Sequence, residues 1–496
     1  MHKERRYTRQ DLVRIACEAM LERGLSPDFP AAVRQELAAL SNSAAHQLKT
    51  ADTAGVADLR ALLWCSIDND DSLDLDQLTV CEPMPGDAVR VRVAIADVDA
   101  WVPRGSAIDE HAQLNTTSVY TSARIFPMLP ERLSTDLSSL NPHEDRLALV
   151  TDMLITADGH IAERSVSRAW VHNHAKLAYD SVSAWLVGQG ELPEPARAVA
   201  GMDEQLRAQD AVAQRLRARR HAQGSLEFET FQPRAVFEGD QVVDLRQQEH
   251  NRARQLIEEL MIATNTCTAH FLASRGGASM RRVVRSPERW LRIVELARKY
   301  GESLPAAPDS KALENFLAQR HRADPLRFAD LSLTIVKLMG SGEYVVERAD
   351  AAPIGHFGLA ERDYTHSTAP NRRFPDLITL RMIKAMLNEA APPYSLLELE
   401  QLALHCTLQE DAARKVERRM RKSEAALFLA PLKGHFFDGV VTGRGEGGNW
   451  VRIFSPPAEG MLVGQLPELQ VGQQIRVKLT STQVERGFID FVMAHD

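Results

Sequence analysis

The spacing of apolar residues predicts that the chain begins with two short helices. Apolar side chains recur at helical spacing from Leu12 to Met20, after an N-cap formed by Thr8 with Asp11, and Gly24 ends the run. A second helical run follows a turn and extends from Val33 to Leu40. Two helices joined by a tight turn predict a helical, helix-turn-helix-like domain over residues 1–50, although a plain helical hairpin packed on its neighbour fits equally well.

The rest of the chain alternates between strand and helix patterns. Strand-like runs such as Val89–Ile95 and Leu147–Val150 are separated by turns rich in Gly, Pro and Asp, and residues 190–222 and 246–275 have the character of helices. Near the C-terminus, Val451–Ile453, Ile475–Leu479 and Ile489–Phe491 alternate between glycine-containing turns. Short strands at this spacing predict a small β-barrel. We therefore expect an α+β protein that ends in a barrel.

Composition narrows the class of protein. A chain of 496 residues suggests about three domains. The net charge of −8 excludes a basic coat over the whole surface, so a nucleic-acid partner would need local basic patches. Five scattered cysteines without a CxxC pair fit a reducing compartment. The start has no apolar leader, and no run approaches eighteen apolar residues. We therefore expect a cytoplasmic protein that does not enter a membrane.

The strongest chemical signal is an acidic loop from Ser66 to Gln77. It carries five aspartates, at positions 68, 70, 71, 74 and 76, and no basic residue. An extended backbone from Leu73 to Asp76 would bury both leucines and point the last two carboxylates to one side. Two carboxylates about 7 Å apart repel by roughly 2 kcal/mol, and a bound divalent cation would reverse that sign. Oxygen ligands of this kind suit Mg²⁺ or Mn²⁺.

Two other interpretations of this loop need no catalysis. A solvated acidic turn explains the composition by itself. A calcium-binding EF-hand loop starting at Asp68 is rejected, because Leu73 replaces its obligatory glycine and Thr79 replaces its bidentate glutamate.

The loop and several separated motifs together resemble the RNB catalytic domain of the ribonuclease II/R family, whose members degrade RNA from the 3′ end to nucleoside 5′-monophosphates. The motifs occur in the family's order at Val93–Val98, Phe126–Ser134, Ala175–Asp180, Ile257–Ala263 and His356–Leu377. The resemblance extends over residues 58–430, and the strands over residues 433–496 resemble the OB-fold RNA-binding barrel of S1 type that closes these enzymes. It implies an RNB catalytic domain, in which helices surround a mixed sheet.

The resemblance also implies roles for particular residues. Asp68, Asp74 and Asp76 match the aspartates that hold the metal, with Asp76 indispensable for hydrolysis, and Arg372 matches the arginine beside the scissile phosphate. The remaining matches are substrate-binding residues: Tyr120 and Phe228 clamp the last bases, Tyr179 and Glu258 contact the ribose near the 3′ end, and Arg373 accompanies Arg372.

Three departures from the family pattern matter. Asp76 is followed by Gln77 where the family has a second aspartate, which weakens the expectation of a second metal ion. The segment Ala369–Phe374 keeps the family's two arginines but loses two hydroxyls. The resemblance also implies cold-shock barrels before the catalytic domain, and we expect the helical segment of about fifty residues to stand in their place.

The sequence thus predicts a processive, metal-dependent 3′→5′ exoribonuclease that uses Mg²⁺ or Mn²⁺. Its substrate would be single-stranded RNA with a free 3′ end and little sequence preference, with tailed structured RNA as a further substrate to test. We expect a monomer. The main alternative is a catalytically weakened or inactive RNA-binding protein on the same fold, with Gln77 marking the decayed site. An unrelated metal phosphoesterase acting on small molecules would leave the terminal barrel unexplained.

Overall fold

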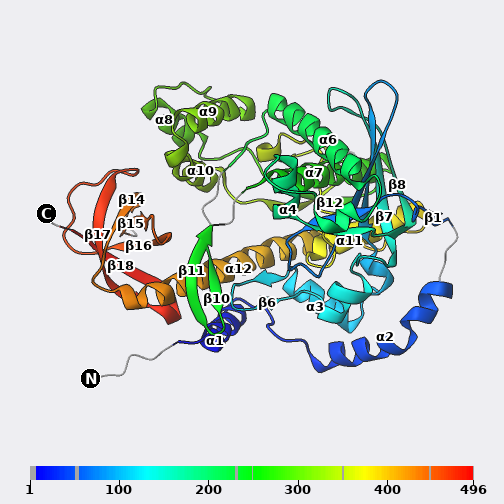
Figure 1. Ribbon diagram of the computed structural model, residues 1–496, viewed down its shortest axis with the longest axis horizontal. Helices are drawn as coiled ribbons and strands as arrows, with labels where there is room; N and C mark the ends of the chain where they lie inside the picture. The colour runs from blue at the N-terminus through cyan, green and yellow to red at the C-terminus, as the bar shows by residue number, and fades with distance from the viewer. Residues whose placement is uncertain are drawn as a thin grey trace.

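A computed structural model describes residues 7–50, 55–228, 233–247, 250–348, 351–445 and 448–494. Residues 1–6 of the predicted N-terminal domain therefore lie outside the described residues. The molecule has a large mixed α/β body and a C-terminal barrel, and one long helix runs between them (Figure 1). The predicted α+β fold with a terminal barrel is confirmed.

A seven-stranded sheet forms the centre of the large body, in the spatial order β1-β8-β7-β4-β3-β2-β9. Its strands are β1 (Ala57–Asp58), β2 (Cys65–Asp68), β3 (Gln77–Pro83), β4 (Val89–Ala96), β7 (Asp145–Ile155), β8 (Ile161–His172) and β9 (Ala175–Ala178). Neighbours are antiparallel, except that β1 runs parallel to β8 and β2 runs parallel to β9. Consequently β2, β4 and β9 all end at the edge of the sheet where β3 begins, and the acidic loop lies at that edge.

Alternating side chains bury both faces of this sheet. In β4, Val91 and Val93 pack with one group of helices, whereas Ala94 and Ala96 pack with another. The first group contains α4 (Tyr179–Leu186), α5 (Glu194–Arg197), α6 (Met202–Gln223) and α7 (Arg252–Ser274). The second group contains α3 (Ala107–Asn115), α11 (Phe374–Leu387) and the start of α12 (Leu396–Leu429). The sheet is therefore the middle layer of three.

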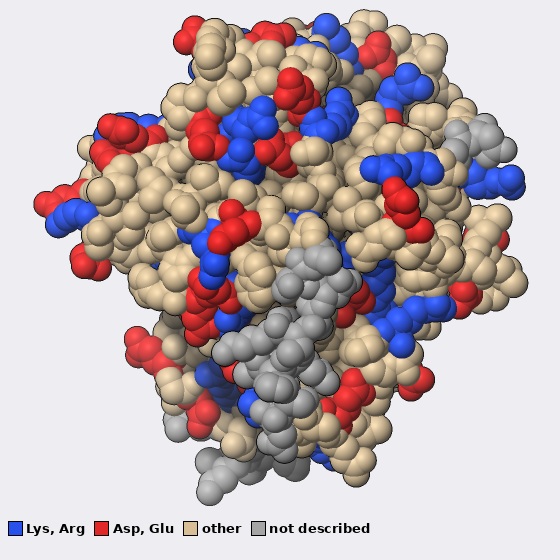
Figure 2. Space-filling model, turned by 90° about the vertical axis from the view of Figure 1, so that its right-hand side faces the viewer, with Lys and Arg blue, Asp and Glu red and all other residues tan. Residues whose placement is uncertain are grey.

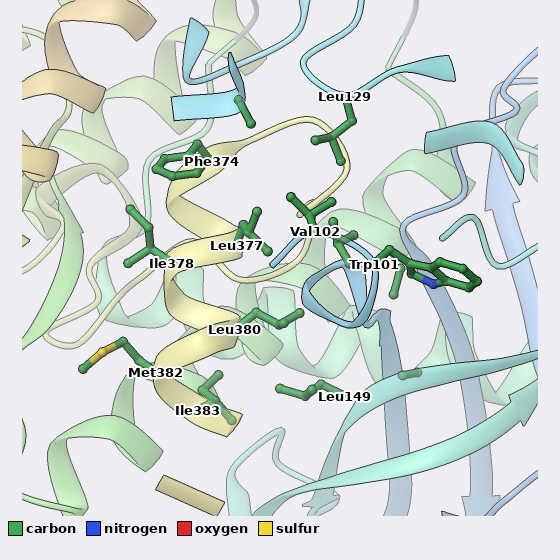
Figure 3. Close-up of a cluster of buried hydrophobic side chains, with 14 of the residues drawn as sticks. Trp101, Val102, Leu129, Leu149, Phe374, Leu377, Ile378, Leu380, Met382 and Ile383 are labelled. Atoms are coloured by element: carbon green, nitrogen blue, oxygen red, sulfur yellow. The ribbon is translucent and has the colours of Figure 1, made fainter. Parts of the chain in front are cut away.

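Helix α11 is deeply buried: its first ten residues, Phe374 to Ile383, are all buried. Phe374, Leu377 and Ile378 are almost fully buried. In Figure 3, Leu377 lies on the side of α11 that faces Val102, from the segment after β4, whereas Phe374 and Ile378 lie on the other side of the helix. Pro375 lies in the first turn of α11, where its missing N–H costs no hydrogen bond. The core thereby fixes the loop immediately before α11, which carries Arg372.

Shorter elements surround these layers. The hairpins and strand pairs are β5 (Val119–Tyr120) with β6 (Ile125–Phe126), β10 (Pro233–Glu238) with β11 (Gln241–Gln247), and β12 (Ser279–Val283) with β13 (Glu343–Glu347). A separate helical cluster, built on its own apolar core, contains α8 (Trp290–Lys299), α9 (Ser310–Ala323) and α10 (Pro325–Met339).

The C-terminal barrel is closed, in the order β14-β15-β16-β18-β17. Its strands are β14 (Phe436–Gly445), β15 (Gly448–Ile453), β16 (Ala458–Leu462), β17 (Gln474–Gln483) and β18 (Phe488–Met493). Along β17, Ile475, Val477 and Leu479 are buried and the residues between them are exposed, as the period-two pattern predicts. Helix α12, which begins with a capping box between Ser395 and Glu398, packs its C-terminal half against this barrel.

The two N-terminal helices form, but the second continues to Thr50 instead of ending at the predicted Leu40, and the two pack in different places. α1 (Arg9–Leu21) carries the predicted capping box between Thr8 and Asp11, and it packs with α12 and the barrel. Val33, Leu37 and Leu40 of α2 (Ala31–Thr50) pack instead with the core of the large body. The two helices lie apart in Figure 1, beneath the β10–β11 hairpin and beneath α3. The helix-turn-helix comparison therefore describes their order along the chain and not their packing.

The surface carries both signs of charge. On the face shown in Figure 2, Lys and Arg side chains are interspersed with Asp and Glu. This agrees with the net charge of −8. No helix among the described residues is both long and apolar enough to cross a membrane.

Candidate active site

Backbone hydrogen bonds hold the last part of the acidic loop at the sheet edge. The Leu75 N–H donates to Ser139 Oγ at 3.0 Å, and that hydroxyl donates to the Leu73 carbonyl at 2.8 Å. The Asp76 carbonyl accepts from the backbone N–H of Ala96 at 3.0 Å. Leu75 is buried as expected, but the prediction that Leu73 is buried is wrong, because its side chain is 60% exposed. Of the two leucines, Leu75 is therefore the one that anchors the loop in the core, and Asp74 and Asp76 flank it.

Asp76 is the buried carboxylate of the site, with 1% of its surface exposed. Its Oδ1 accepts from the backbone N–H of Asn371 at 3.0 Å, and its Oδ2 accepts from Arg372 Nε at 3.1 Å. Burial raises the pKa of Asp76 to about 7, the charge of Asp74 adds to this shift, and Arg372 opposes it. Burying the ionised form of Asp76 is unfavourable, and the protein offsets this with one backbone N–H donor and one guanidinium.

Arg372 presents the rest of its guanidinium toward solvent. The loop before α11 is tightened by hydrogen bonds from the backbone N–H groups of Arg372 and Arg373 to the Ala369 carbonyl, at 3.2 and 2.9 Å. The side chain of Arg372 remains 44% exposed despite its ion pair with Asp76. Burial alone would lower the pKa of Arg372, but the nearby Tyr120 and Asp76 outweigh that effect and raise it. Arg372 is therefore a permanent cation with donors left for an anionic ligand.

Asp68 and Asp74 complete the acidic group. Asp68 Oδ1 accepts from the Asn69 backbone N–H at 2.7 Å and from Ser72 Oγ at 3.0 Å. Burial raises the pKa of Asp74, Arg372 opposes the shift, and Asp68 adds to it, so these charges lie within electrostatic reach of one another. Together they suit a hard divalent cation, which would relieve this repulsion.

The carboxylates do not form a closed metal cage. Among the described residues, no three His, Cys, Asp or Glu side chains are arranged so that they alone could hold a metal ion. The joint ligation of one ion by Asp68, Asp74 and Asp76 stays a prediction. An ion with only one or two of these carboxylates as ligands would need water or phosphate oxygens to complete its shell, as Mg²⁺ commonly has. Gln77, which follows Asp76, is buried as the first residue of β3.

Tyr120 lies beside Arg372. It ends β5, and its backbone N–H donates to Glu417 Oε1 of α12 at 3.0 Å. Burial raises the pKa of the Tyr120 hydroxyl to about 12, Arg372 opposes the shift, and Asp74 and Asp76 add to it. The aromatic ring is therefore neutral and placed next to the arginine and the aspartates.

Tyr179 lies beside Asp68, at the start of the acidic loop. The register of β2 with β9 pairs Asp68 with Ala178, which places Tyr179 directly beyond Asp68 at the start of α4. Burial raises the pKa of Tyr179, and the charge of Asp68 adds to that shift. The guanidinium of Arg254 lies 4.4 Å from the centre of the Tyr179 ring and donates to Asn69 Oδ1 at 2.8 Å.

Arg254 was missed at the sequence level. It lies four residues before Glu258 on α7, so the two side chains share one face of that helix. This spacing is the one signal that could have drawn attention to it, because Glu258 was already a candidate.

The remaining predicted residues have other neighbours. Glu258 is half-exposed and lies 3.6 Å from His250 Nε2. Arg373 donates to Asp376 Oδ1 at 2.7 Å, an ion pair that ties the loop to the first turn of α11. Phe228 is partly buried against the apolar core of the α8–α10 cluster. The structure thus groups Asp68, Asp74, Asp76, Tyr120, Tyr179 and Arg372, and it gives Glu258, Arg373 and Phe228 other contacts.

Comparison with known proteins decides the family. Residues 56–389 match the model of the RNB domain, and residues 435–494 match that of the RNase II-type exonuclease C-terminal S1 domain. The chain belongs to the ribonuclease II/R (RNB) family. The resemblance inferred from the motifs is confirmed, and the domain limits 58–430 and 433–496 stay predictions.

One curated relative and two solved structures show what this RNB protein resembles. Ribonuclease R of Vibrio cholerae is 30% identical over 455 residues, which cover 88% of this chain and 53% of the relative. The apo structure of Mycoplasma genitalium RNase R has a TM-score of 0.87 at 23% identity, covering 98% of this chain and 78% of that one. Yeast Ssd1, described as a pseudonuclease, has a TM-score of 0.66 at 16% identity, covering 82% of this chain and 50% of that one. The chain spans about half the length of the curated relatives it matches, and structural likeness at these identities shows the fold alone.

Proposed function

We propose that this RNB protein is a processive, metal-dependent 3′→5′ exoribonuclease that hydrolyses single-stranded RNA to nucleoside 5′-monophosphates. The observation that carries the proposal is the pairing of Asp76 with Arg372, whose side chain is 44% exposed. A buried carboxylate and a partly free guanidinium, flanked by two tyrosines, suit a phosphodiester at the end of a strand. Solved structures of Mycoplasma genitalium RNase R hold ribose-methylated single-stranded RNA and double-stranded RNA, which supports RNA as the substrate class.

Each side chain of the site has a separate role in binding the 3′ end of the RNA. Arg372 binds a non-bridging phosphate oxygen and stabilises the charge that develops there during in-line attack. Tyr120 stacks on a terminal base, which needs no sequence preference because every base has a π-face. Tyr179, steadied by Arg254, contacts the terminal ribose. Phe228 and Glu258 would join them as a second stacking residue and a 2′-hydroxyl acceptor, and Arg373 would support Arg372 through its pair with Asp376.

Asp68, Asp74 and Asp76 would hold the divalent cation, which we propose to be Mg²⁺ with Mn²⁺ as a substitute. When bound, such an ion lowers the pKa of water and polarises a phosphoryl oxygen. The protein's own contribution is to keep Asp76 fixed through Asn371 and Arg372, so that its position does not depend on the substrate. We further propose a cytoplasmic monomer.

A second candidate is an RNA-binding protein on this fold that no longer cleaves. Gln77 offers a neutral oxygen where the family has a carboxylate, and the fold is shared with the pseudonuclease Ssd1. This candidate predicts tight RNA binding without release of mononucleotides in either Mg²⁺ or Mn²⁺.

One experiment separates the two. The protein is incubated with RNA carrying a 3′ tail, with metal and with EDTA, and mononucleotide release and RNA binding are both measured. We expect release that EDTA stops, and Asp76→Asn should reduce the rate by at least about 10²–10³-fold while RNA still binds. Substantial hydrolysis by Asp76→Asn would contradict the assigned site. Binding without any release by the wild type would favour the second candidate.

A further inference from the structure

The hairpin that carries Tyr120 is too short to fix its own position. Its strands β5 and β6 pair at two positions, Val119 with Phe126 and Tyr120 with Ile125. An isolated two-stranded hairpin is marginally stable at best in water, even when it is longer than this one. Contacts from outside the hairpin must therefore set the position of the Tyr120 ring.

The chain just before the hairpin is bonded to the loop that carries Arg372. The backbone N–H of Ser118 donates to the Arg372 carbonyl at 3.0 Å, and the hydroxyl of Thr117 donates to the same oxygen at 3.1 Å. In addition, the Phe374 N–H donates to the Thr116 carbonyl at 2.8 Å. These bonds keep the start of the hairpin next to the arginine. They act before β5 begins, so they do not fix the far end of the hairpin.

Two carboxylates of α12 bond the hairpin beyond that point. Glu417 Oε1 accepts from the backbone N–H of Tyr120 at 3.0 Å. Glu424 accepts from the backbone N–H of Ser122 at 3.2 Å and from the Ser122 hydroxyl at 2.9 Å. The two glutamates are seven residues apart, which is about two helical turns, so they lie on one face of α12. That face therefore presents both acceptors to the hairpin.

The hairpin in turn offsets the cost of burying these carboxylates. Glu424 is 1% exposed, and burial raises its pKa to about 7. Burial also raises the pKa of Glu417. The hydrogen bonds from Ser122 and Tyr120 oppose these two shifts, as does the charge of Arg421. Moving the hairpin away would leave buried acceptors without their donors, which is unfavourable, so the contact holds both partners in place.

Helix α1 of the N-terminal domain holds the turn of the same hairpin. Arg9 Nε donates to the Ala123 carbonyl at 2.9 Å. The side chains of Val119, Ala123 and Phe126 belong to the same apolar cluster as Leu12 of α1. The hairpin therefore lies between α1 and α12, and each helix contributes hydrogen bonds to it.

Helix α1 is itself connected to two other parts of the molecule. Arg14 contacts Glu485, between the last two strands of the barrel, at 2.6 Å. Glu22, just after α1, contacts Arg419 of α12 at 2.6 Å. Surface pairs of this kind contribute little to stability. They do orient α1, and with it the guanidinium of Arg9, relative to the hairpin.

We propose that Arg9, Glu417 and Glu424 are positioning residues for Tyr120, and that α1 supports the hairpin so that the ring stays beside Arg372 to stack on the terminal base. The inference rests on the proposed stacking role of Tyr120, but not on hydrolysis. It gives the N-terminal helix a function in the reaction that requires no contact with RNA, because α1 acts through the hairpin.

The test follows the stacking of the last base directly. RNA with a fluorescent adenine analogue as its 3′-terminal base is bound in EDTA, so that hydrolysis does not contribute, and both fluorescence quenching and affinity are measured. Tyr120→Ala should remove most of the quenching and lower the affinity about tenfold. Glu417→Met and Arg9→Met each remove one bond to the hairpin, and each should lower quenching and reduce the affinity about threefold.

The same substitutions are then made in Tyr120→Ala protein. A residue that acts through Tyr120 has no further effect once the ring is absent, whereas a residue that acts through its charge or through general stability keeps its effect. Glu417→Gln loses the charge but keeps an acceptor oxygen for the Tyr120 N–H, so it should behave as the wild type.

Two exposed residues provide matched controls. Glu400→Met on α12 and Arg23→Met just after α1 make the same changes away from the hairpin, and they should leave quenching and affinity unchanged. Ser122→Ala tests the Glu424 contact from the hairpin side, because Glu424 is buried and its replacement can prevent folding. Ser122→Ala should also lower quenching.

Three results would overturn the inference. The first is loss of quenching in Tyr120→Ala but not in Glu417→Met, Arg9→Met or Ser122→Ala. The second is an equal loss in the two controls, or an undiminished loss in the Tyr120→Ala background. The third is unchanged quenching in Tyr120→Ala, which would refute the stacking role and the inference with it. Binding without mononucleotide release in metal would refute the proposed hydrolysis alone, since the quenching in EDTA would still decide the inference.

Discussion

Two arginines, Arg372 just before α11 and Arg381 in the middle of that helix, differ in how many of their guanidinium donors the protein itself occupies. Arg381 is 3% exposed, and its nitrogens contact Asp99 and Asp109 at 2.8 Å each, together with the Val102 carbonyl at 2.7 Å and the Tyr394 hydroxyl at 2.8 Å. Arg372 is 44% exposed and contacts one carboxylate, that of Asp76. The fold therefore occupies the guanidinium of Arg381, whereas Arg372 keeps donors for a ligand.

The carboxylates that pair with these two arginines also differ. The pKa of Asp99 is lowered because Lys384 and Arg381 outweigh its burial. The pKa of Asp76 is raised to about 7, because burial outweighs the single arginine. A buried carboxylate whose charge is balanced by cations of the protein stabilises the fold. A buried carboxylate whose charge is only partly balanced can bind a metal ion or a cationic group as well. The comparison therefore identifies which charges are structural and which belong to the site.

The largest expected effect comes from exchanging the two arginines for alanine. Arg372→Ala should lower the rate of RNA hydrolysis by about 10²–10³-fold and lower the thermal midpoint less than Arg381→Ala does, because within the fold it removes a single side-chain bond, from Nε to Asp76. Arg381→Ala should instead destabilise the fold by about 3–5 kcal/mol, since it leaves Asp99 and Asp109 without that cation. Rates measured per folded molecule, together with denaturant titrations, check both. A stable Arg381→Ala variant with a low rate would break the comparison.

The same pair of arginines shows what could be predicted from the chain and what could not. The capping box at Thr8, the strand at Val89–Ala96 and the alternation in β17 all follow from local spacing, and the structure agrees with each. The contact between Asp76 and Arg372 joins residues 296 positions apart. No periodicity encodes it, and it was expected only because the motifs resemble a family.

The adjacent residues Arg372 and Arg373 show what the sequence alone does not predict, namely which carboxylate each side chain contacts. Arg372 and Arg373 are equivalent in the sequence, yet one faces Asp76 and the other faces Asp376. The backbone turn before α11 decides which side chain points to which carboxylate, and that turn depends on packing around Phe374. Arg254 was missed for the related reason that its partners, Tyr179 and Asn69, lie on other elements.

A second prediction concerns pH and the two carboxylates, tested in EDTA so that no metal contributes. The folded pKa of Asp76 is raised, so its proton stabilises the fold below about 4 and this contribution is lost as pH rises toward 7. Asp76→Asn should therefore be more stable than the wild type above pH 7, and the difference should shrink at low pH. The folded pKa of Asp99 is lowered, so Asp99→Asn should be less stable at neutral pH, with a difference that shrinks as pH falls below about 4. Thermal midpoints across this range check both signs, and parallel curves for the two variants would refute the distinction.

The smallest effect should come from Tyr120, which lies beside Arg372 but makes no bond to the reacting phosphate in our proposal. Tyr120→Ala removes a stacking surface worth about 1–3 kcal/mol per base, so release of the last fragment should occur earlier and the final oligonucleotide should be longer. Tyr120→Phe, which keeps the ring, should retain the wild-type end product. Gel analysis of the final fragments measures this. Phe228→Ala tests whether Phe228, which packs on the α8–α10 core, also stacks on a base. A longer final product would assign its ring to the clamp. A loss of stability with an unchanged product would assign it to that core alone.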